Sequence, residues 1–269
     1  MRIEDGHMNK IDQQLERVKQ EKRLGLMTHV VVGYPSLDVT KKLVITMEQA
    51  GVDFVELQIP FSDPLADGPT IMRACEESLE AGTKVKDAFG IAWELSQQVH
   101  IPLLFMGYYN TVFKYGVEQF CKDSKEAGIS GLIIPDVPLE EEEREHFLAR
   151  CKKYDLYAIR VISPASTFDR LQKNAKYAEG FVYCTARQGT TDAKKRLDLK
   201  LERYLQQVKK TFSVPVAVGF GISSNERVDL IRSHADIAVV GSALIDVINN
   251  SSSDRIEEEV SGFIHSLEV

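Results

Sequence analysis

The chain has 269 residues, of which 43% are apolar, enough to bury the core of one large domain. Its formal net charge of −7 argues against nucleic acid or an anionic membrane surface as a partner, because both bind surfaces rich in Lys and Arg. No apolar run approaches the ~20 residues that cross a bilayer, so we expect no membrane-spanning helix. The amino end also lacks a secretory pattern.

The four cysteines lie far apart, and none belongs to a metal-ligand pair such as CxxC. We therefore expect neither a metal site nor a disulfide framework. Free thiols are typical of a reduced compartment, so the sequence indicates a cytoplasmic protein. The residues concerned are Cys75, Cys121, Cys151 and Cys184.

Residues 1–8 carry no apolar periodicity and are interpreted as a tag or a disordered start, which leaves 9–269 as a single domain. Residues 11–20 (IDQQLERVKQ) predict an extra helix, placed to close the floor of a barrel. Helical periodicity with a closing Gly follows in segments such as 37–51 and 117–128, and 243–269 supply the last helices. Eight short apolar runs predict strands at 28–33, 53–59, 102–107, 131–136, 157–163, 180–185, 214–221 and 236–242.

This alternation predicts an α/β fold, a closed (β/α)8 TIM barrel with an additional N-terminal helix. An open doubly wound sheet alternates in the same way and is the rival. The count of eight favours the barrel, as do the polar residues Glu56, Gln58 and Arg160 within the apolar runs. Strands of an open parallel sheet are covered on both faces and are apolar throughout.

Glu56 stands near the end of the second apolar run, four residues before Pro60. Alternation predicts that Val55, Leu57 and Ile59 face the helices, whereas Phe54, Glu56 and Gln58 face inward. A carboxyl group there is partly removed from water at the mouth of the barrel, which suits proton transfer near neutral pH. The alternative is a structural ion pair with an interior cation such as Arg160.

The next segment, FSDPLADGPT (61–70), is acidic and stiff. Pro64 and Pro69 fix the backbone and Gly68 permits a tight bend, so we expect Asp63 and Asp67 to be held over the same mouth. Asp-Gly is also ordinary turn chemistry, which would explain Asp67 without catalysis.

Two glycine-containing segments, GFGISS (219–224) and GSAL (241–244), each follow an apolar run and open a helical one. Helix N-termini and close backbone approach suit a phosphate group, and barrels bind phosphate after the seventh and eighth strands. We therefore expect a phosphate site at Gly221, Gly241 and Ser242. Plain helix caps are the alternative, and a dinucleotide fingerprint is disfavoured because Ser224 replaces its last glycine.

Several runs together resemble the tryptophan synthase alpha subunit family. They are ELQIPFSDPLADGPTI (56–71), YYNTVFKYG (108–116), PDVPLEE (135–141), VGFGIS (218–223) and VGSAL (240–244), in the order and spacing of that family. The resemblance implies cleavage of indole-3-glycerol phosphate to indole and glyceraldehyde 3-phosphate. It also implies no cofactor in this chain, and transfer of indole to a pyridoxal-phosphate-bearing beta subunit in an α2β2 complex.

The resemblance also assigns roles. Glu56 is implied to be the mobile acid and base, and Asp67 the fixed carboxylate that steadies the indole N–H. The implied phosphate contacts are Gly221, Gly241, Ser242 and the position of Asp192. The implied pocket for the indole and glycerol groups consists of His29, Tyr108, Ile133, Val161, Tyr183, Thr191 and Phe220.

Three positions depart from the family pattern. Gln58 stands where Gly is usual, and its amide is expected to crowd or hydrogen-bond Glu56. His29 replaces a usual Phe, and would either stack as an aromatic ring or add a titratable group beside Glu56. Asp192 replaces a phosphate-binding Gly in the loop 186–196, where it would repel the substrate anion unless a neighbouring cation offsets it.

These departures leave a second reading open, a subunit that mainly activates the beta partner while cleaving substrate poorly. Another phosphosugar barrel, such as an isomerase, would share the phosphate segments but does not predict the loop 61–70. The leading interpretation is an active, cofactor-free lyase.

Overall fold

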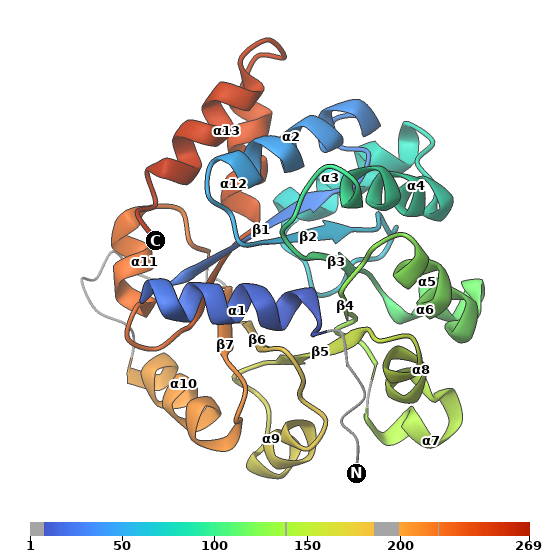
Figure 1. Ribbon diagram of the computed structural model, residues 1–269, viewed down its shortest axis with the longest axis vertical. Helices are drawn as coiled ribbons and strands as arrows, with labels where there is room; N and C mark the ends of the chain where they lie inside the picture. Colours follow the sequence, from blue (N-terminus) through green and yellow to red (C-terminus); the bar gives the residue numbers. More distant parts are fainter. Residues whose placement is uncertain (1–7, 138, 186–198, 220) are drawn as a thin grey trace.

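The computed structural model describes residues 8–137, 139–185, 199–219 and 221–269. Within them, eight parallel strands close into one barrel in sequence order, as the alternation predicted (Figure 1). The strands are β1 (Gly25–Val31), β2 (Phe54–Gln58), β3 (Leu103–Met106), β4 (Gly131–Ile133), β5 (Tyr157–Ile162), β6 (Val182–Thr185), β7 (Val216–Gly219) and β8 (Ile237–Val240).

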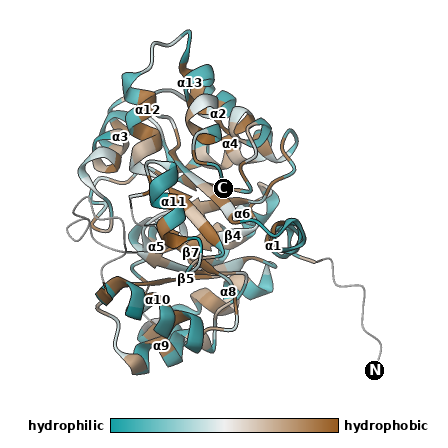
Figure 2. Cartoon of the chain, turned by 90° about the vertical axis from the view of Figure 1, so that its left-hand side faces the viewer, coloured by the Kyte–Doolittle hydropathy of each residue, from teal (hydrophilic) through white to brown (hydrophobic). Residues whose placement is uncertain are grey.

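Helices surround the strands and bury their apolar faces against the outside of the barrel (Figure 2). Val55, Leu57 and Ile59 of the second run all belong to this outer layer, as alternation predicted. The helices are α1 (Lys10–Glu21), α2 (Leu37–Gln49), α3 (Pro69–Glu80), α4 (Val85–Ser96), α5 (Tyr109–Tyr115), α6 (Val117–Glu126), α7 (Glu142–Glu145), α8 (Phe147–Lys153), α9 (Phe168–Ala175), α10 (Leu199–Thr211), α11 (Asn225–Ile231), α12 (Ser242–Asn250) and α13 (Ile256–His265), with a 3-10 turn at Leu139–Glu141.

The predicted N-terminal helix is confirmed as α1, which crosses the amino ends of the strands (Figure 1). Its Ile11 is fully buried and joins the cluster inside the barrel. Room for that side chain comes from Gly131 and Gly180, where an added Cβ would stand 3.0 and 3.1 Å from Ile11 atoms. Asn9 fixes the start of the helix by accepting from Ile11 N and donating to Ser130 O. The helix therefore seals the floor of the barrel.

The interior of the barrel is filled by side chains, as expected for eight strands. Phe54 and Phe181 meet edge to face, with ring centroids 5.9 Å apart. Members of the cluster from the strands include Met27, Phe54, Leu104, Ile133, Ile159, Ala217, Ile237 and Val239. Because the lower barrel is packed, any substrate must enter at the carboxyl ends of the strands.

Two expectations about the strands are wrong. The first strand covers Gly25–Val31 rather than 28–33, because Gly25 starts the ladder by pairing with Ile237 of β8. Arg160 does not face inward. It shares the outer face of β5 with Ala158 and Ile162, and its Nε donates to Asn174 Oδ1 at 2.9 Å. The alternative of a Glu56–Arg160 ion pair is therefore excluded.

Candidate active site

Glu56 and His29 face each other inside the barrel, on β2 and β1. The register pairs them directly, and both are buried, with exposed fractions of 2% and 4%. His29 Nδ1 lies 3.2 Å from Glu56 Oε2. This is an ion-pair distance rather than a well-aligned hydrogen bond, since Oε2 has no hydrogen-bond partner among the described residues. The predicted inward orientation of Glu56 is confirmed.

The charge state of His29 is set by opposing effects. Burial is the largest single cause and lowers the pKa of the imidazole, whereas the charge of the Glu56 carboxyl group 3.2 Å away raises it. The charge of Asp67 and the amide of Gln58 add to the rise, and the pKa of His29 ends above its ordinary value. Of the two possibilities for His29, the structure therefore supports the titratable group beside Glu56.

Asp67 is held by two donors over the same mouth. Gln58 Nε2 donates to its Oδ2 at 2.7 Å, and the Tyr108 hydroxyl donates to the same oxygen at 2.8 Å. Asp67 N closes the turn by donating to Pro64 O at 3.0 Å. The Tyr108 hydroxyl also accepts from Ala66 N, which fastens the loop to the end of β3. These contacts fasten the loop to the barrel as expected, whereas its stiffness and the catalytic role of Asp67 stay predictions.

Gln58 does not behave as expected. Its amide nitrogen bonds Asp67 rather than Glu56, so the anticipated hydrogen bond to Glu56 is wrong. Its Oε1 is buried and lacks a hydrogen-bond partner, as does Nε2 of His29, in the described part of the chain. Buried polar atoms are normally paired, and unpaired ones gather at sites that await a ligand.

The apolar wall of the mouth comes from four of the predicted pocket residues. Tyr108, Ile133, Val161 and Tyr183 all belong to the interior cluster or pack against it. Burial, together with the charges of Glu56 and Asp67, holds the pKa of Tyr183 well above its ordinary value, so its hydroxyl stays neutral. Gly219 makes room for that hydroxyl, which an added Cβ would approach to 3.0 Å.

One of the two predicted phosphate segments, GSAL (241–244), lies beside His29. Gly241 precedes the first turn of α12, and a Cβ added to it would stand 3.7 Å from Cβ of His29. Ser242 opens α12, whose N-terminus is not capped by a side chain of the described residues. Gly221 has a φ of 63°, a left-handed conformation that favours glycine. An anion at this helix end would thus lie next to His29.

Three predicted site residues, Thr191, Asp192 and Phe220, lie outside the described residues. Sequence reasoning missed Phe61 and Ile71. The Phe61 ring stacks on Tyr108 with centroids 5.3 Å apart, and Ile71 Cδ1 would lie 3.6 Å from a Cβ added to Gly241. Phe61 begins the loop 61–70 and Ile71 follows it directly, so their closeness to Asp67 in the sequence was the available signal.

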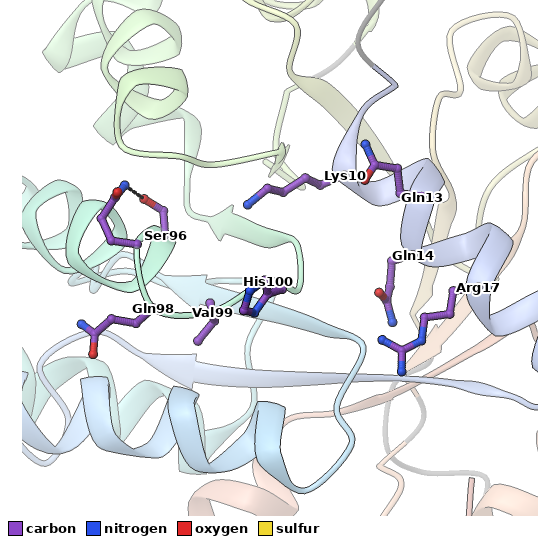
Figure 3. A pocket seen from close by; sticks show the side chains of 9 residues that line it. Lys10, Gln13, Gln14, Arg17, Ser96, Gln98, Val99 and His100 are labelled. Carbon is purple, nitrogen blue, oxygen red and sulfur yellow. Dashed lines mark hydrogen bonds between the residues drawn. The ribbon is translucent and has the colours of Figure 1, made fainter.

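A separate hollow of about 470 Å³ lies at the opposite end of the barrel, between α1 and the segment before β3 (Figure 3). Its lining is polar and mostly exposed, with Lys10, Gln13 and Arg17 on one side and His100 on the other. It is remote from both carboxylates. Among the described residues, no group of three or more His, Cys, Asp or Glu side chains could hold a metal ion.

The fold and this site together define a class, the (β/α)8-barrel enzymes that work with side-chain acids and bases at the carboxyl ends of the strands. Comparison with known proteins narrows the class. The family model of the tryptophan synthase alpha chain matches residues 15–267. The chain is therefore a member of the tryptophan synthase alpha chain family.

Individual relatives agree. The tryptophan synthase alpha chain of Desulfotalea psychrophila is 43% identical over 242 residues, which covers 90% of this chain and 94% of the relative. Tryptophan synthase subunit alpha from Legionella pneumophila superposes with a TM-score of 0.88 at 30% identity, covering 97% of each chain. Tryptophan synthase from M. tuberculosis gives 0.86 at 27% identity, covering 96% of this chain and 97% of that one. No helix in the described ranges is long and apolar enough to cross a membrane.

Proposed function

We propose that this chain is a lyase that cleaves indole-3-glycerol phosphate to indole and glyceraldehyde 3-phosphate. The observation that carries the proposal is the pair of carboxylates at one mouth, Glu56 on β2 and Asp67 on the loop behind it. Asp67 is held by two donors, whereas Glu56 keeps an oxygen that receives no hydrogen bond from any described residue. One fixed and one adjustable carboxyl group is the set that this reaction needs.

Glu56 performs the proton transfers. In its acid form it donates a proton to C3 of the indole ring, which places positive charge on the ring nitrogen. The resulting carboxylate removes the proton of the glycerol hydroxyl beside the bond that breaks. The carbon–carbon bond then cleaves, its electron pair returns to the ring, and Glu56 ends protonated as it began.

Asp67 stabilises the charge that develops on the indole N–H. Its carboxylate needs no movement for this task, and the donors Gln58 and Tyr108 hold it in place before substrate arrives. Such preorganised electrostatic groups are effective because they need not reorient during the reaction. The wall formed by Tyr108, Ile133, Val161 and Tyr183 covers the ring.

The phosphate group binds at the start of α12. Gly241 and Ser242 offer backbone N–H groups and the positive end of the helix, and Gly221 approaches from the neighbouring loop. Because this helix end lies beside His29, the phosphate group would be held close to the His29–Glu56 pair, with the glycerol chain between them.

We further propose that indole passes to a beta subunit within an α2β2 assembly, and that the pyridoxal phosphate belongs to that partner. Family membership supports this. So do two exposed apolar side chains, Leu65 at 93% and Phe113 at 59%, on segments that leave the carboxyl ends of adjacent strands. A cytoplasmic location fits the four cysteines, which are buried free thiols.

The test is indole release from indole-3-glycerol phosphate by the purified chain, alone and mixed with a tryptophan synthase beta subunit. We expect indole and glyceraldehyde 3-phosphate in equal amounts, faster in the mixture. Stimulation of the beta reaction without indole release in either case would replace the lyase with a pure activator. A Leu65→Asp variant is expected to weaken the stimulation while leaving release by the isolated chain intact.

A further inference from the structure

The two described departures from the family pattern, His29 and Gln58, lie on neighbouring strands of the site. His29 pairs in register with Glu56, and Gln58 follows Glu56 by two residues, so both side chains reach the same interior as Glu56. Both are buried, with exposed fractions of 4% and 0%.

Each of the two side chains contacts a different carboxylate. His29 Nδ1 lies 3.2 Å from Glu56 Oε2, and Gln58 Nε2 donates to Asp67 Oδ2 at 2.7 Å. The remaining polar atoms of the two side chains, His29 Nε2 and Gln58 Oε1, are both buried and without a hydrogen bond to any described residue. The Gln58 amide also helps to raise the pKa of His29, after the larger effects of burial and of Glu56, so the amide acts on the imidazole. One is a donor in the protonated imidazole and the other is an acceptor, so they complement each other.

We propose that His29 and Gln58 act as one positioning device that couples Glu56 to Asp67, with His29 sharing a single proton with Glu56. The inference rests on the proposed lyase activity and deepens it. With Phe and Gly at these positions, the two carboxylates would have no such link.

The proton shared by the pair accounts for both forms of Glu56. When it moves from His29 Nδ1 to Glu56, the imidazole becomes neutral and the carboxyl group becomes the acid that protonates indole C3. After Glu56 takes the proton of the glycerol hydroxyl, that proton can return to Nδ1, which restores the starting pair. Proton number is conserved, and no further reactant is needed.

The groups that titrate around the pair come from several elements. Glu56 lies on β2, Asp67 on the loop before α3, Tyr108 at the end of β3 and Tyr183 on β6. The hydroxyls of both tyrosines stay neutral, because burial and the charge of Asp67 raise their pKa values. On α3, burial likewise raises the pKa of the Cys75 thiol to about 12. His29, whose pKa is raised above its ordinary value, is therefore the group around which a change of charge near neutral pH is expected.

A double-mutant cycle tests the coupling, with His29→Phe, Gln58→Gly and both together. We expect each single variant to lower kcat/KM about tenfold, because each removes one of two complementary buried polar groups and leaves the other beside an apolar residue or a glycine. The double variant should lie within about threefold of the unaltered chain, since removing both partners removes the mismatch. Losses that multiply in the double variant would overturn the coupling.

The pH profile separates proton sharing from packing. A lone carboxyl group loses its proton at lower pH than an imidazole pair, so His29→Phe should move the basic limb of kcat/KM down by at least about one unit. His29→Gln keeps the polar contact but cannot titrate, and it should give the same shift even if the Phe variant folds poorly. His100→Phe, which changes an exposed histidine at the other end of the barrel, is the matched control and should change nothing.

An unshifted profile in both His29 variants would refute proton sharing. Both outcomes, multiplying losses in the cycle and an unshifted pH profile, differ from failure of the lyase proposal. In that case the unaltered chain itself would release no indole.

Discussion

The floor and the mouth of this barrel treat buried polar groups in opposite ways. At the floor, Asp53 is 1% exposed and accepts four hydrogen bonds. Two come from Arg23 at 2.6 and 2.7 Å, one from Leu26 N and one from Gln14. At the mouth, His29, Glu56 and Gln58 each keep a buried atom without a hydrogen bond to any described residue.

The difference separates stability from function. A buried polar atom left unpaired costs about 1–3 kcal/mol, and the floor avoids this cost by pairing every oxygen of the Asp53 side chain. At the mouth, three buried atoms on β1 and β2 have no hydrogen bond to a described residue. We infer that the floor is built to hold the fold and the mouth to receive a polar ligand.

The largest effect is expected on catalysis at the mouth. Asp67→Asn should lower kcat for indole release by about 10²–10³, because the neutral amide cannot stabilise the charge on the indole nitrogen. The fold should persist, since the side-chain oxygen of Asn can still accept from Gln58 and Tyr108. The test is to measure kcat and the thermal unfolding temperature of the variant and of the unaltered chain. An unchanged kcat would show that Asp67 takes no part in the mechanism.

The next largest effect is expected on stability at the floor. Asp53→Ala removes two of the acceptors of Arg23 and leaves Leu26 N without its acceptor, and it should cost roughly 3 kcal/mol of unfolding free energy. The folded fraction should cleave substrate at the normal rate, because Asp53 lies at the far end of the barrel. Denaturant titration together with active-site-normalised rates checks both statements. A large loss of kcat with unchanged stability would show that Asp53 serves catalysis rather than stability, and would contradict the contrast between floor and mouth.

The smallest effect is the pH dependence of stability at His29. The pKa of His29 is raised in the folded chain, because Glu56, Asp67 and Gln58 together outweigh the opposing effect of burial. The folded state therefore binds the imidazole proton more tightly than the unfolded state does. The stabilisation is complete below the unfolded imidazole pKa of about 6.5 and is lost as pH rises through the higher folded value.

The stability difference between the unaltered chain and His29→Phe should shrink over that range, with His100→Phe as the reference. A difference that grows with pH would show that His29 is neutral in the folded chain.

Much of the fold could be predicted from the sequence, because local patterns carry it. Eight apolar runs and the alternation along 53–59 sufficed for the barrel and for the inward direction of Glu56. The sequence led us to expect Arg160 inside the barrel, because both faces of its strand are otherwise apolar. Which face turns inward depends on how the strand pairs with β4 and β6. The start of β1 was missed because Gly25 resembles a helix stop, although it pairs with β8.

At the candidate site, sequence patterns predicted that Glu56 faces the interior, but they predicted fewer of the contacts between side chains. A stiff loop 61–70 is expected from its prolines, because a proline ring restricts the backbone regardless of the residues around it. The direction of the Gln58 amide depends on a side-chain rotamer and on where Asp67 lies, and neither is encoded locally. For the same reason the sequence allowed two roles for His29, and the distance to Glu56 was needed to choose between them.

The most direct single measurement is indole release by Glu56→Gln, with binding of an uncleavable glycerol-phosphate analogue measured on the same sample. Glutamine keeps the shape of the side chain but cannot exchange a proton, so release should fall by at least about 10³ while the analogue still binds. Release at the normal rate, with the analogue bound, would mean that the proton transfers are performed by another group.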